Sequence, residues 1–573
     1  MRQKTGIGYQ SYEEMVEKNI FYIDKTLFIR DWWESADKVT LITRPRRFGK
    51  TLNMSTIECF FSNKYAGRED LFKGKAIWEE EKYRRLQGTY PVICMSFADA
   101  RITEDAGMTK MEEMKASIKQ IIAGVYRNYK DIMKAHMFDG DDRKHFASVG
   151  KDMDDLTASS AISILCGYLE RYYEKKPILL LDEYDTPMQE AWIHGYWDKA
   201  VNFFRSFFGT TFKNRDGFDR AIITGITRIS KESIFSELNH LEVVTTTSDR
   251  YAEYFGFTEK EVFRALDDAG MEKHKKGVKR WYDGFTFGKY TDIYNPWSIT
   301  SFIKNGGKYE TYWANTSSNS LVSGLMKTGS AAMKQTVEDL LAEKSFCVPI
   351  DEQIVYDQIE RNENAVWSLL LAAGYLKVIE VEAYAADRTD EPRYTLAFTN
   401  LEVLLMFKKL VKEWFEVETE GSTYNRFVKA LLMNDVDYMN EFMNEIALQS
   451  FSEFDIARST SGLDAPERFY HGFVLGLMVG LQNRFVITSN RESGFGRYDI
   501  VLTPLDSKKD DAYIIEFKVY KPKQEKNLEE TVANAHRQIR EKQYESELRA
   551  RGIAPGKIRK YGFAFRGKEC LIG

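Results

Sequence analysis

Residues 40–51 read TLITRPRRFGKT, and this stretch decides the fold of the 573-residue chain. Its apolar, β-branched start predicts a buried strand, which runs into a basic loop and then into Gly49-Lys50-Thr51 at the start of a helix. In such a strand–loop–helix unit, backbone N–H groups surround an anion, the lysine reaches the terminal phosphates and the threonine hydroxyl can bind Mg²⁺. We therefore interpret the stretch as a phosphate-binding loop.

One residue of the loop departs from the general pattern G-x-x-x-x-G-K-[ST], since Arg44 stands where the first glycine is expected. A chance GKT tripeptide at a helix start is the alternative interpretation. The strand before the loop and an acidic strand further along the chain favour a nucleotide site. The loop residues that we expect to contact the nucleotide are Arg46, Arg47, Phe48, Gly49, Lys50 and Thr51.

Length and composition narrow the classes of protein that this chain can form. A chain of 573 residues is too long for one core and predicts roughly three or four domains. Hydrophobic residues make up 43% and aromatic residues 14%, which supports packed interiors and excludes a disordered chain. Because the net charge is only −5, any nucleic-acid binding must come from a local basic patch.

Cysteine usage and hydropathy bear on the compartment. The five cysteines are scattered, with no CxxC pair and no histidine at zinc spacing, which indicates a reducing compartment and no structural zinc. The N-terminus has no apolar signal core, and no apolar run approaches the ~20 residues of a membrane-spanning helix. We expect a cytoplasmic protein that does not enter a membrane.

Residues 177–187, PILLLDEYDTP, form the second informative stretch. Four consecutive apolar residues predict a buried parallel strand, which delivers Asp182 and Glu183 at its carboxyl end, where open α/β sheets bind ligands. We expect Asp182 to hold Mg²⁺ through water and Glu183 to polarise the water that attacks the γ-phosphate. A helix cap after a strand is the alternative, but two adjacent carboxylates are costly there without a cation.

A third buried strand is predicted over residues 220–225, and it ends before Thr227 and Arg228. In ATPases with an extra strand between the phosphate-loop strand and the acidic strand, this position carries a polar sensor of the γ-phosphate. Thr227 and Arg228 are therefore candidate nucleotide contacts. Pairing of Arg228 with an acidic neighbour is an equally good interpretation.

Together these stretches resemble the AAA-ATPase-like domain of many bacterial and archaeal proteins of unknown function. The matching motifs are YIDKT (22–26), TRPRRFGKT (43–51), LLLDEYDTP (179–187) and TGITRISKESIFSELN (224–239). In that family RPRRFGK is the normal form of the loop, so the resemblance implies that Arg44 is a family feature. The match continues through YDGF (282–285), YNPWS (294–298) and YW (312–313), in a region that we interpret as a helical lid.

Residues 345–451 change character. An apolar helix is predicted at residues 366–371, followed by strands at 375–384 and 393–398 that flank a polar turn. A helix followed by a hairpin suggests a winged-helix-like module. Because the turn carries acidic residues as well as Arg388, we favour a structural connector over a DNA contact.

The C-terminal region carries a second constellation of chemical groups. An apolar helix at residues 467–481 bears Glu467, and two later strands bear Asp499 and the pair Glu516 and Lys518. Residues 516 and 518 are two apart on a strand, so their side chains share one face. Carboxylates that collect Mg²⁺ beside a lysine that positions water are what a metal-dependent nuclease needs.

This region resembles the PD-(D/E)XK nuclease superfamily, through GRYDIVL (496–502), IIEFKVY (514–520) and a later helix with Gln538, Ile539 and Tyr544. The resemblance implies a catalytic set of Glu467, Asp499, Glu516 and Lys518, with Glu467, Asp499 and Glu516 as metal ligands and Gln538 in support. The superfamily's proline before the aspartate is Tyr498 here. From Asp506 to Gly573 there are 16 basic and 11 acidic residues, a local excess that suits a phosphate backbone.

We therefore expect an α/β protein of four parts: an AAA-ATPase-like P-loop domain (1–257), a helical lid (258–344), a helical or winged-helix-like connector (345–451) and a nuclease-like domain (452–573). The expected function is ATP binding and hydrolysis coupled to Mg²⁺- or Mn²⁺-dependent cleavage of DNA or RNA. The alternative is an ATP-dependent switch or scaffold whose inactive nuclease-like domain only binds nucleic acid or a protein partner. A remodelling motor that forms a ring is a third interpretation, and the oligomeric state stays open.

Overall fold

The chain divides into two compact units, which are Met1–Ser318 with Cys347–Val403, and Asn319–Phe346 with Leu404–Gly573. The predicted connector of residues 345–451 thus contributes to both units. The computed structural model describes residues 4–100, 108–213, 217–229, 234–235, 238, 240–314, 325, 331–352, 359, 362–382, 391–414, 423–450, 474, 478, 481, 484–489, 492–493, 496–497, 499–567 and 569–573. Within these residues no helix combines the length and the apolar character needed to cross a bilayer.

A five-stranded parallel sheet forms the centre of the first unit, with strand order β2-β3-β4-β1-β5. Its strands are β1 (Val39–Thr43), β2 (Val92–Ser96), β3 (Ile178–Asp182), β4 (Ala221–Gly225) and β5 (Leu241–Val244). Strand β4, which starts one residue after the predicted strand, lies between the phosphate-loop strand β1 and the acidic strand β3. Because all five strands are parallel, their carboxyl ends meet at one edge.

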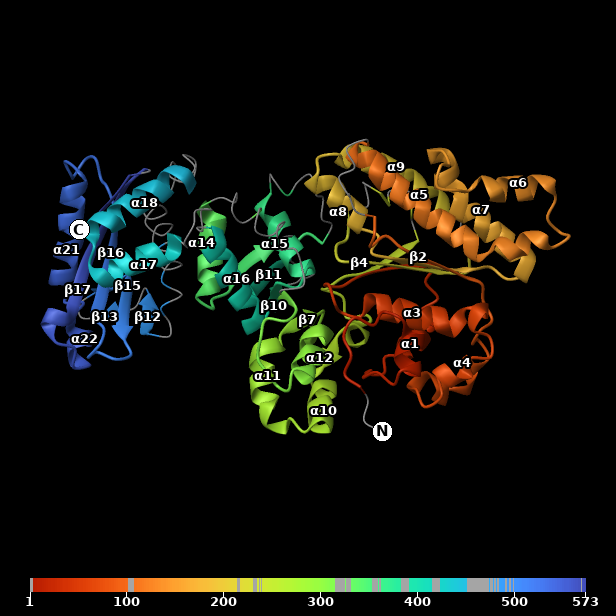
Figure 1. The fold of residues 1–573 in the computed structure, drawn as a ribbon, viewed down its shortest axis with the longest axis horizontal. Coiled ribbons are helices and arrows are strands. Elements are labelled where there is room, and N and C mark those ends of the chain that lie inside the picture. Colours follow the sequence, from red (N-terminus) through yellow and green to blue (C-terminus); the bar gives the residue numbers. More distant parts are fainter. Residues whose placement is uncertain are drawn as a thin grey trace. The chain divides into compact units, whose positions relative to one another are not determined.

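Helices cover both faces of this sheet, which explains why strands β1, β3 and β4 are buried along their whole length (Figure 1). On one face lie α1 (Tyr12–Glu17), α3 (Lys50–Phe61) and α4 (Glu81–Arg84), and on the other α5 (Lys110–Asn128), α7 (Asp155–Tyr173), α8 (Thr186–Ile193) and α9 (Trp197–Phe212). The remaining helices of this part are α2 (Leu27–Glu34), η1 (Asn63–Tyr65), η2 (Glu69–Leu71), η3 (Ala76–Glu79), η4 (Lys130–Lys134) and α6 (Gly140–Ser148).

The predicted lid contains helices and a small antiparallel sheet of order β6-β8-β7. This region begins slightly before the predicted boundary at residue 258, and its elements are η5 (Ala252–Tyr254), β6 (Phe257–Thr258), α10 (Glu259–Ala269), η6 (Glu272–His274), α11 (Lys275–Tyr282), β7 (Phe285–Phe287), β8 (Tyr290–Tyr294) and α12 (Pro296–Lys304). Thr258 and Glu261 form a reciprocal capping box that starts α10. Aromatic and aliphatic side chains of α10, α11 and α12 pack into one buried cluster around Tyr282.

The helix and hairpin predicted in the connector are present in the first unit. Helix α15 (Glu363–Ala372) precedes the antiparallel pair β10 (Leu376–Glu382) and β11 (Arg393–Phe398). Strand β9 (Phe346–Pro349) completes a sheet of order β10-β11-β9. Gly284 of the lid lies so close to this module that a Cβ there would be 2.1 Å from the Thr399 carbonyl oxygen, so the two parts are in tight contact.

A buried carboxylate joins the lid to the start of the next helix, α16 (Leu401–Trp414). Glu402 Oε2 accepts a hydrogen bond of 2.8 Å from Ser298 Oγ of α12, and its Oε1 accepts one of 2.6 Å from the Trp313 backbone N–H. The Ala314 N–H, at 3.4 Å, is a third donor. Burial raises the pKa of Glu402 to about 7 although these donors oppose the change.

The second unit is built on a mixed sheet of order β12-β15-β16-β17-β18, in which only β16 and β17 are parallel. Its elements are α14 (Ala331–Leu341), α17 (Thr423–Met433), α18 (Val436–Ser450), β12 (Phe485–Ser489), β13 (Glu492–Ser493), β14 (Gly496–Arg497), β15 (Ile500–Pro504), β16 (Ala512–Val519), α21 (Leu528–Glu541), α22 (Ser546–Ala550), η10 (Pro555–Lys557), β17 (Ile558–Arg566) and β18 (Glu569–Ile572). Side chains alternate between its faces: Ile500 and Leu502 join the core under α17 and α18, whereas Val501 joins that under α21 and α22.

We predict that Glu402→Gln changes the pH dependence of stability. The folded protein binds the Glu402 proton more tightly than the unfolded chain does, because burial raises this pKa from 4.5 to about 7. The stability from this group is therefore complete below the unfolded pKa and is lost as the pH rises through the folded pKa. Between about pH 5 and about pH 7.5, the native protein should lose about 2–3 kcal/mol relative to Glu402→Gln, which keeps both donor and acceptor functions.

Urea denaturation of both proteins at several pH values measures this difference. The exposed Glu272→Gln is the matched control, and it should follow the native pH profile. A Glu402→Gln profile parallel to the native one would contradict the prediction.

Candidate nucleotide and nuclease sites

The phosphate loop connects β1 to α3 through two left-handed residues. Gly49, the N-cap of α3, has φ +79°, and Arg47 has φ +66°. The left-handed region favours glycine, and it turns the chain so that α3 begins directly at Lys50. Strand, loop and helix are therefore arranged as the sequence predicts.

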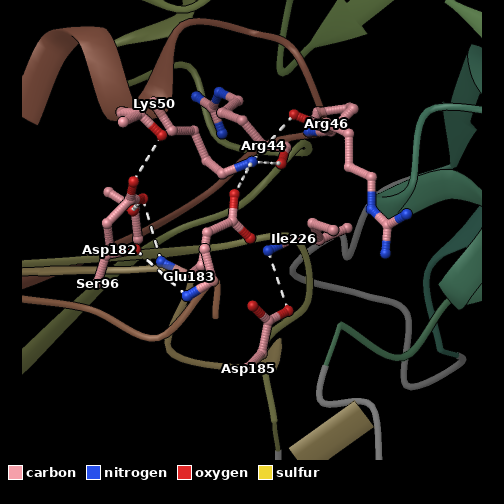
Figure 2. Close-up of polar contacts among 12 residues, drawn as sticks. Arg44, Arg46, Lys50, Ser96, Asp182, Glu183, Asp185 and Ile226 are labelled. Carbon is pink, nitrogen blue, oxygen red and sulfur yellow. Dashed lines mark hydrogen bonds and ion pairs between the residues drawn. The ribbon is translucent and has the colours of Figure 1, made fainter. Parts of the chain in front are cut away.

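Lys50 lies inside the loop and faces the acidic strand (Figure 2). Its buried Nζ donates to the carbonyl oxygens of Arg44 at 3.1 Å and Pro45 at 3.2 Å. The same nitrogen is 3.4 Å from Glu183 Oε1. The cationic group therefore lies between the loop backbone and the carboxylate that we predict to be catalytic.

Asp182 joins three neighbouring segments at the carboxyl edge of the sheet. Its Oδ2 accepts a hydrogen bond of 2.6 Å from Thr51 Oγ1. Its Oδ1 accepts from Thr224 Oγ1 of β4 and from the Glu183 N–H. Burial and the neighbouring Glu183 raise the pKa of Asp182, while its hydrogen bonds and Lys50 lower it.

The chemistry of these groups suits a magnesium ion. A hydroxyl and a carboxylate in direct contact are hard oxygen ligands, the type that Mg²⁺ takes beside nucleotide phosphates. A positive ion would also relieve the two adjacent carboxylates of Asp182 and Glu183, the charge pair that raises the Asp182 pKa. The predicted ligands Thr51 and Asp182 therefore fit the expected ion.

Glu183 combines partial exposure with backbone strain. Its side chain is 21% exposed, and its φ of +54° lies in the left-handed region, which is unfavourable for a residue with a Cβ. Strained backbone of this kind is concentrated at functional sites, where it aims a side chain. The strain supports the water-activating role predicted for Glu183 over a cap.

Arg44, which replaces the first glycine of the general pattern, points into the protein interior. Its guanidinium donates to the carbonyl oxygens of Thr43, Thr245 and Arg250. It also lies 4.5 Å from the centroid of the Phe287 ring, and burial lowers its pKa to about 9. This residue therefore ties the start of the loop to the segment after β5 and to the lid.

Arg46 contacts both the helical layer and the lid. Its Nη2 is 3.4 Å from Gln189 Oε1 of α8. Its carbonyl oxygen accepts hydrogen bonds from Trp313 Nε1 at 3.0 Å and from Asn295 Nδ2 at 3.3 Å. The backbone of the loop is therefore held by two residues from motifs that the sequence placed in the lid.

The next two loop residues also pack on the lid. The Arg47 guanidinium lies 4.3 Å from the centroid of the Trp297 ring, a cation–π contact. Phe48 is buried and its ring is 4.7 Å from that of Phe285. Direct nucleotide contact by Arg46, Arg47 and Phe48 stays a prediction, and these contacts show that all three also support the loop.

Thr227 and Arg228 follow β4, as predicted. Thr227 is buried, and its N–H and hydroxyl both donate to Asp185 Oδ2 at 2.8 Å. Arg228 Nη1 lies 4.0 Å from Glu352 Oε2, so an acidic neighbour is present as the alternative interpretation requires. Their contact with the γ-phosphate stays a prediction.

The predicted nuclease residues that the structure describes lie together in the second unit. Asp499 precedes β15 and its Oδ2 accepts a 2.7 Å hydrogen bond from the Phe517 N–H of β16. Lys518 Nζ lies 3.2 Å from Glu516 Oε1, in agreement with the shared face expected from their spacing. Glu467, the fourth predicted catalytic residue, lies outside the described residues.

Helix α21 packs on the face of the sheet that carries Glu516, and its Gln538 contacts this cluster. Gln538 Nε2 donates to Glu516 Oε1 and lies 3.0 Å from the Tyr544 hydroxyl. Burial raises the pKa of Tyr544, and the charges of Glu516 and Asp499 act in the same direction. Two carboxylates, a lysine and an amide form a set whose oxygen atoms suit a divalent cation such as Mg²⁺.

Fold and site together define a P-loop ATPase-like domain followed by a nuclease-like domain. Residues 6–235 match the family model described as "Predicted AAA-ATPase", and residues 465–573 match the one described as "PD-(D/E)XK nuclease superfamily". An uncharacterised protein in the vnfD 5′ region of Azotobacter chroococcum mcd 1 is 25% identical over 571 residues, 96% of this chain and 95% of that protein. The Walker-type ATPase PABY2304 of Pyrococcus abyssi aligns with 71% of this chain and 99% of its own, at 12% identity and a TM-score of 0.33.

Sequence reasoning missed three residues that shape the nucleotide site. Thr224 is the one polar residue between Ala221 and Gly225 in strand β4, and that contrast could have marked it as a partner of Asp182. Asp185 stands three residues after Asp182, but nothing in the sequence says that it reaches the residues after β4. Asn295 was recognised only within a family motif, and no local pattern indicates its contact with the loop.

We predict that Arg44→Met destabilises the protein. The substitution keeps an apolar stem but leaves the carbonyl oxygens of Thr43, Thr245 and Arg250 without their common donor, two of them in buried bonds, a loss of about 2–4 kcal/mol. Urea denaturation of the native protein and of Arg44→Met measures this difference in the free energy of unfolding. Arg85→Met, the same change at an exposed position, should stay within about 0.5 kcal/mol of the native protein, and equal stability of both variants would show that the Arg44 contacts are dispensable.

Proposed function

We propose that this protein binds and hydrolyses ATP, and that its nucleotide state regulates Mg²⁺- or Mn²⁺-dependent cleavage of DNA or RNA by the C-terminal domain. One observation carries the proposal most directly. Thr51 from the loop and Asp182 from the acidic strand meet at 2.6 Å, with Lys50 and Glu183 paired next to them. P-loop ATPases use these four side-chain types at this edge of the sheet.

The chain's own groups divide the work at the ATP site. Lys50 leaves the loop carbonyls to contact the β- and γ-phosphates, while Thr51 and Asp182 hold Mg²⁺, which neutralises phosphate charge when bound. Glu183 orients the attacking water and takes up its proton. Thr227 and Arg228 contact the γ-phosphate from the end of β4.

In the C-terminal domain, Asp499, Glu516 and Glu467 would hold a divalent metal ion, which when bound would supply positive charge next to the scissile phosphate. Lys518 positions the attacking water. Gln538 restrains Glu516, with which it forms a hydrogen bond. The local excess of basic residues supports binding of a polyanionic substrate.

Two substitutions separate ATP binding from hydrolysis. Lys50→Ala should abolish ATP binding, because it removes the cation that faces the phosphates. Glu183→Gln should bind ATP like the native protein but hydrolyse it about 10²–10⁴-fold more slowly, because the amide is not a base. Binding of a fluorescent ATP analogue and phosphate release measure the two steps, with the exposed Lys73→Ala as control. Native hydrolysis by Glu183→Gln would overturn its role.

A nuclease assay tests the second activity. Native protein with Mg²⁺ or Mn²⁺ should cleave single-stranded DNA, double-stranded DNA or RNA, whereas Glu516→Gln and Lys518→Met should lose about 10²-fold or more. The exposed Glu529→Gln on α21 is the matched control and should cleave normally. Salt-sensitive nucleic-acid binding without cleavage under either metal would overturn the nuclease and support an ATP-dependent switch.

The same assay with and without ATP tests regulation. ATP should change the cleavage rate of the native protein, and Lys50→Ala should not respond. If the native protein and Lys50→Ala both cleave at the same rate with ATP as without it, the two activities are independent and the proposed coupling is rejected.

A further inference from the structure

The two residues that follow the acidic pair Asp182-Glu183 both reach across to the segment after β4. Asp185 Oδ2 accepts hydrogen bonds from the Ile226 N–H at 3.0 Å (Figure 2) and from the N–H and hydroxyl of Thr227, both at 2.8 Å. One carboxylate oxygen therefore holds three donors of a single turn. Asp185 is buried, so water does not compete for these bonds.

Tyr184 contacts the same turn through its hydroxyl group. Its hydroxyl donates to the Thr227 carbonyl oxygen at 2.8 Å and accepts from the Ile229 N–H at 3.0 Å. Its backbone N–H also donates to the Thr224 carbonyl oxygen at 3.0 Å. The segments after β3 and after β4 are therefore interlocked by side-chain and backbone contacts.

Gly225 makes the interlock possible. A Cβ at this position would lie 2.5 Å from Asp185 Oδ1 and 2.7 Å from the Tyr184 ring, distances that real Cβ atoms do not adopt. Asp185 Oδ1 is buried and has no hydrogen-bond partner among the described residues. A buried polar oxygen without a hydrogen-bond partner costs free energy, so the protein retains Asp185 at a cost in stability while its other oxygen holds the turn.

We propose that Asp185 is a positioning residue for ATP hydrolysis, which holds the turn of Ile226 and Thr227 at a set distance from Glu183. This inference rests on the proposed ATPase function. Asp185 is two residues from Glu183 and accepts hydrogen bonds from Thr227. It therefore connects Glu183, which orients the water, with the segment after β4, which contacts the γ-phosphate. Because the hydrolytic step requires both at once, a displacement of the turn costs rate.

The effect should fall on kcat and not on nucleotide binding. Lys50 and Thr51 bind the phosphates and the metal ion from a different loop, which none of the Asp185 hydrogen bonds touches. Removal of an interaction that is made only in the transition state lowers kcat and leaves KM unchanged. Substitution of a residue that only holds the fold would instead lower the stability and the nucleotide affinity together.

Steady-state ATP hydrolysis by the full-length chain tests the proposal. Asp185→Ala, which removes all three acceptor contacts, should lower kcat about 10²-fold with KM and ATP-analogue affinity within about threefold of native. Asp185→Asn should recover most of the rate, because its amide oxygen accepts from the same N–H groups. Gly225→Ala places a methyl group against Asp185 Oδ1 and the Tyr184 ring, so it should displace the same contacts and reproduce the kcat defect, which keeps the test decisive where Asp185→Ala does not fold.

The outcomes separate this inference from the ATPase function itself. Native hydrolysis that Glu183→Gln abolishes, together with an unchanged kcat in Asp185→Ala, would reject the positioning role alone. A joint loss of melting temperature and ATP affinity in both Asp185→Ala and Gly225→Ala would also reject it, in favour of a structural clamp. Absence of hydrolysis by the native chain would reject the function on which the inference rests.

Discussion

The nucleotide site depends on the buried carboxylate of Asp182. Parallel strands bring their carboxyl ends to one edge, and this side chain accepts hydrogen bonds there from the hydroxyls of Thr51, in the first turn of α3, and Thr224 of β4. It also accepts from the Glu183 N–H, and so helps to set the strained backbone from which the Glu183 side chain leaves. Loss of this carboxylate would release three chain segments at once, which is why its position constrains the rest of the site.

Contacts with the segment after β5 and with the lid stabilise the phosphate loop. In the general pattern a first glycine allows the chain to turn closely, whereas here Arg44 turns inward and binds carbonyl oxygens after β5. Trp313 and Asn295 hold the Arg46 carbonyl from the lid, and Phe48 is buried against Phe285. A basic, aromatic loop without the first glycine therefore keeps its shape because three parts of the first unit contact it.

Local chemistry made the sheet and the positions of the site residues predictable. The apolar run before Asp182 predicts the buried strand that is found, and the two-residue spacing of Glu516 and Lys518 places them on one face, as their 3.2 Å contact shows. Most partners of Arg44 and Glu402 were not predictable, because all of their side-chain hydrogen bonds except the one from Arg44 to Thr43 join residues 88 to 206 positions apart. Local patterns carry no information on such pairings. For the same reason they do not show that residues 345–451 contribute to two compact units.

Helix α16 contains the border between the two compact units. Its first turn supplies Glu402 to the first unit, and from Leu404 onward its residues belong to the second, so the border between the units falls inside a continuous helix. A helix of 14 residues extends about 21 Å and resists bending far more than a loop of equal length. The contacts of Glu402 with Ser298 and Trp313 fix the first turn of this helix to the lid. A truncation between Val403 and Leu404 would separate the 3 residues of the helix that carry Glu402 from the other 11.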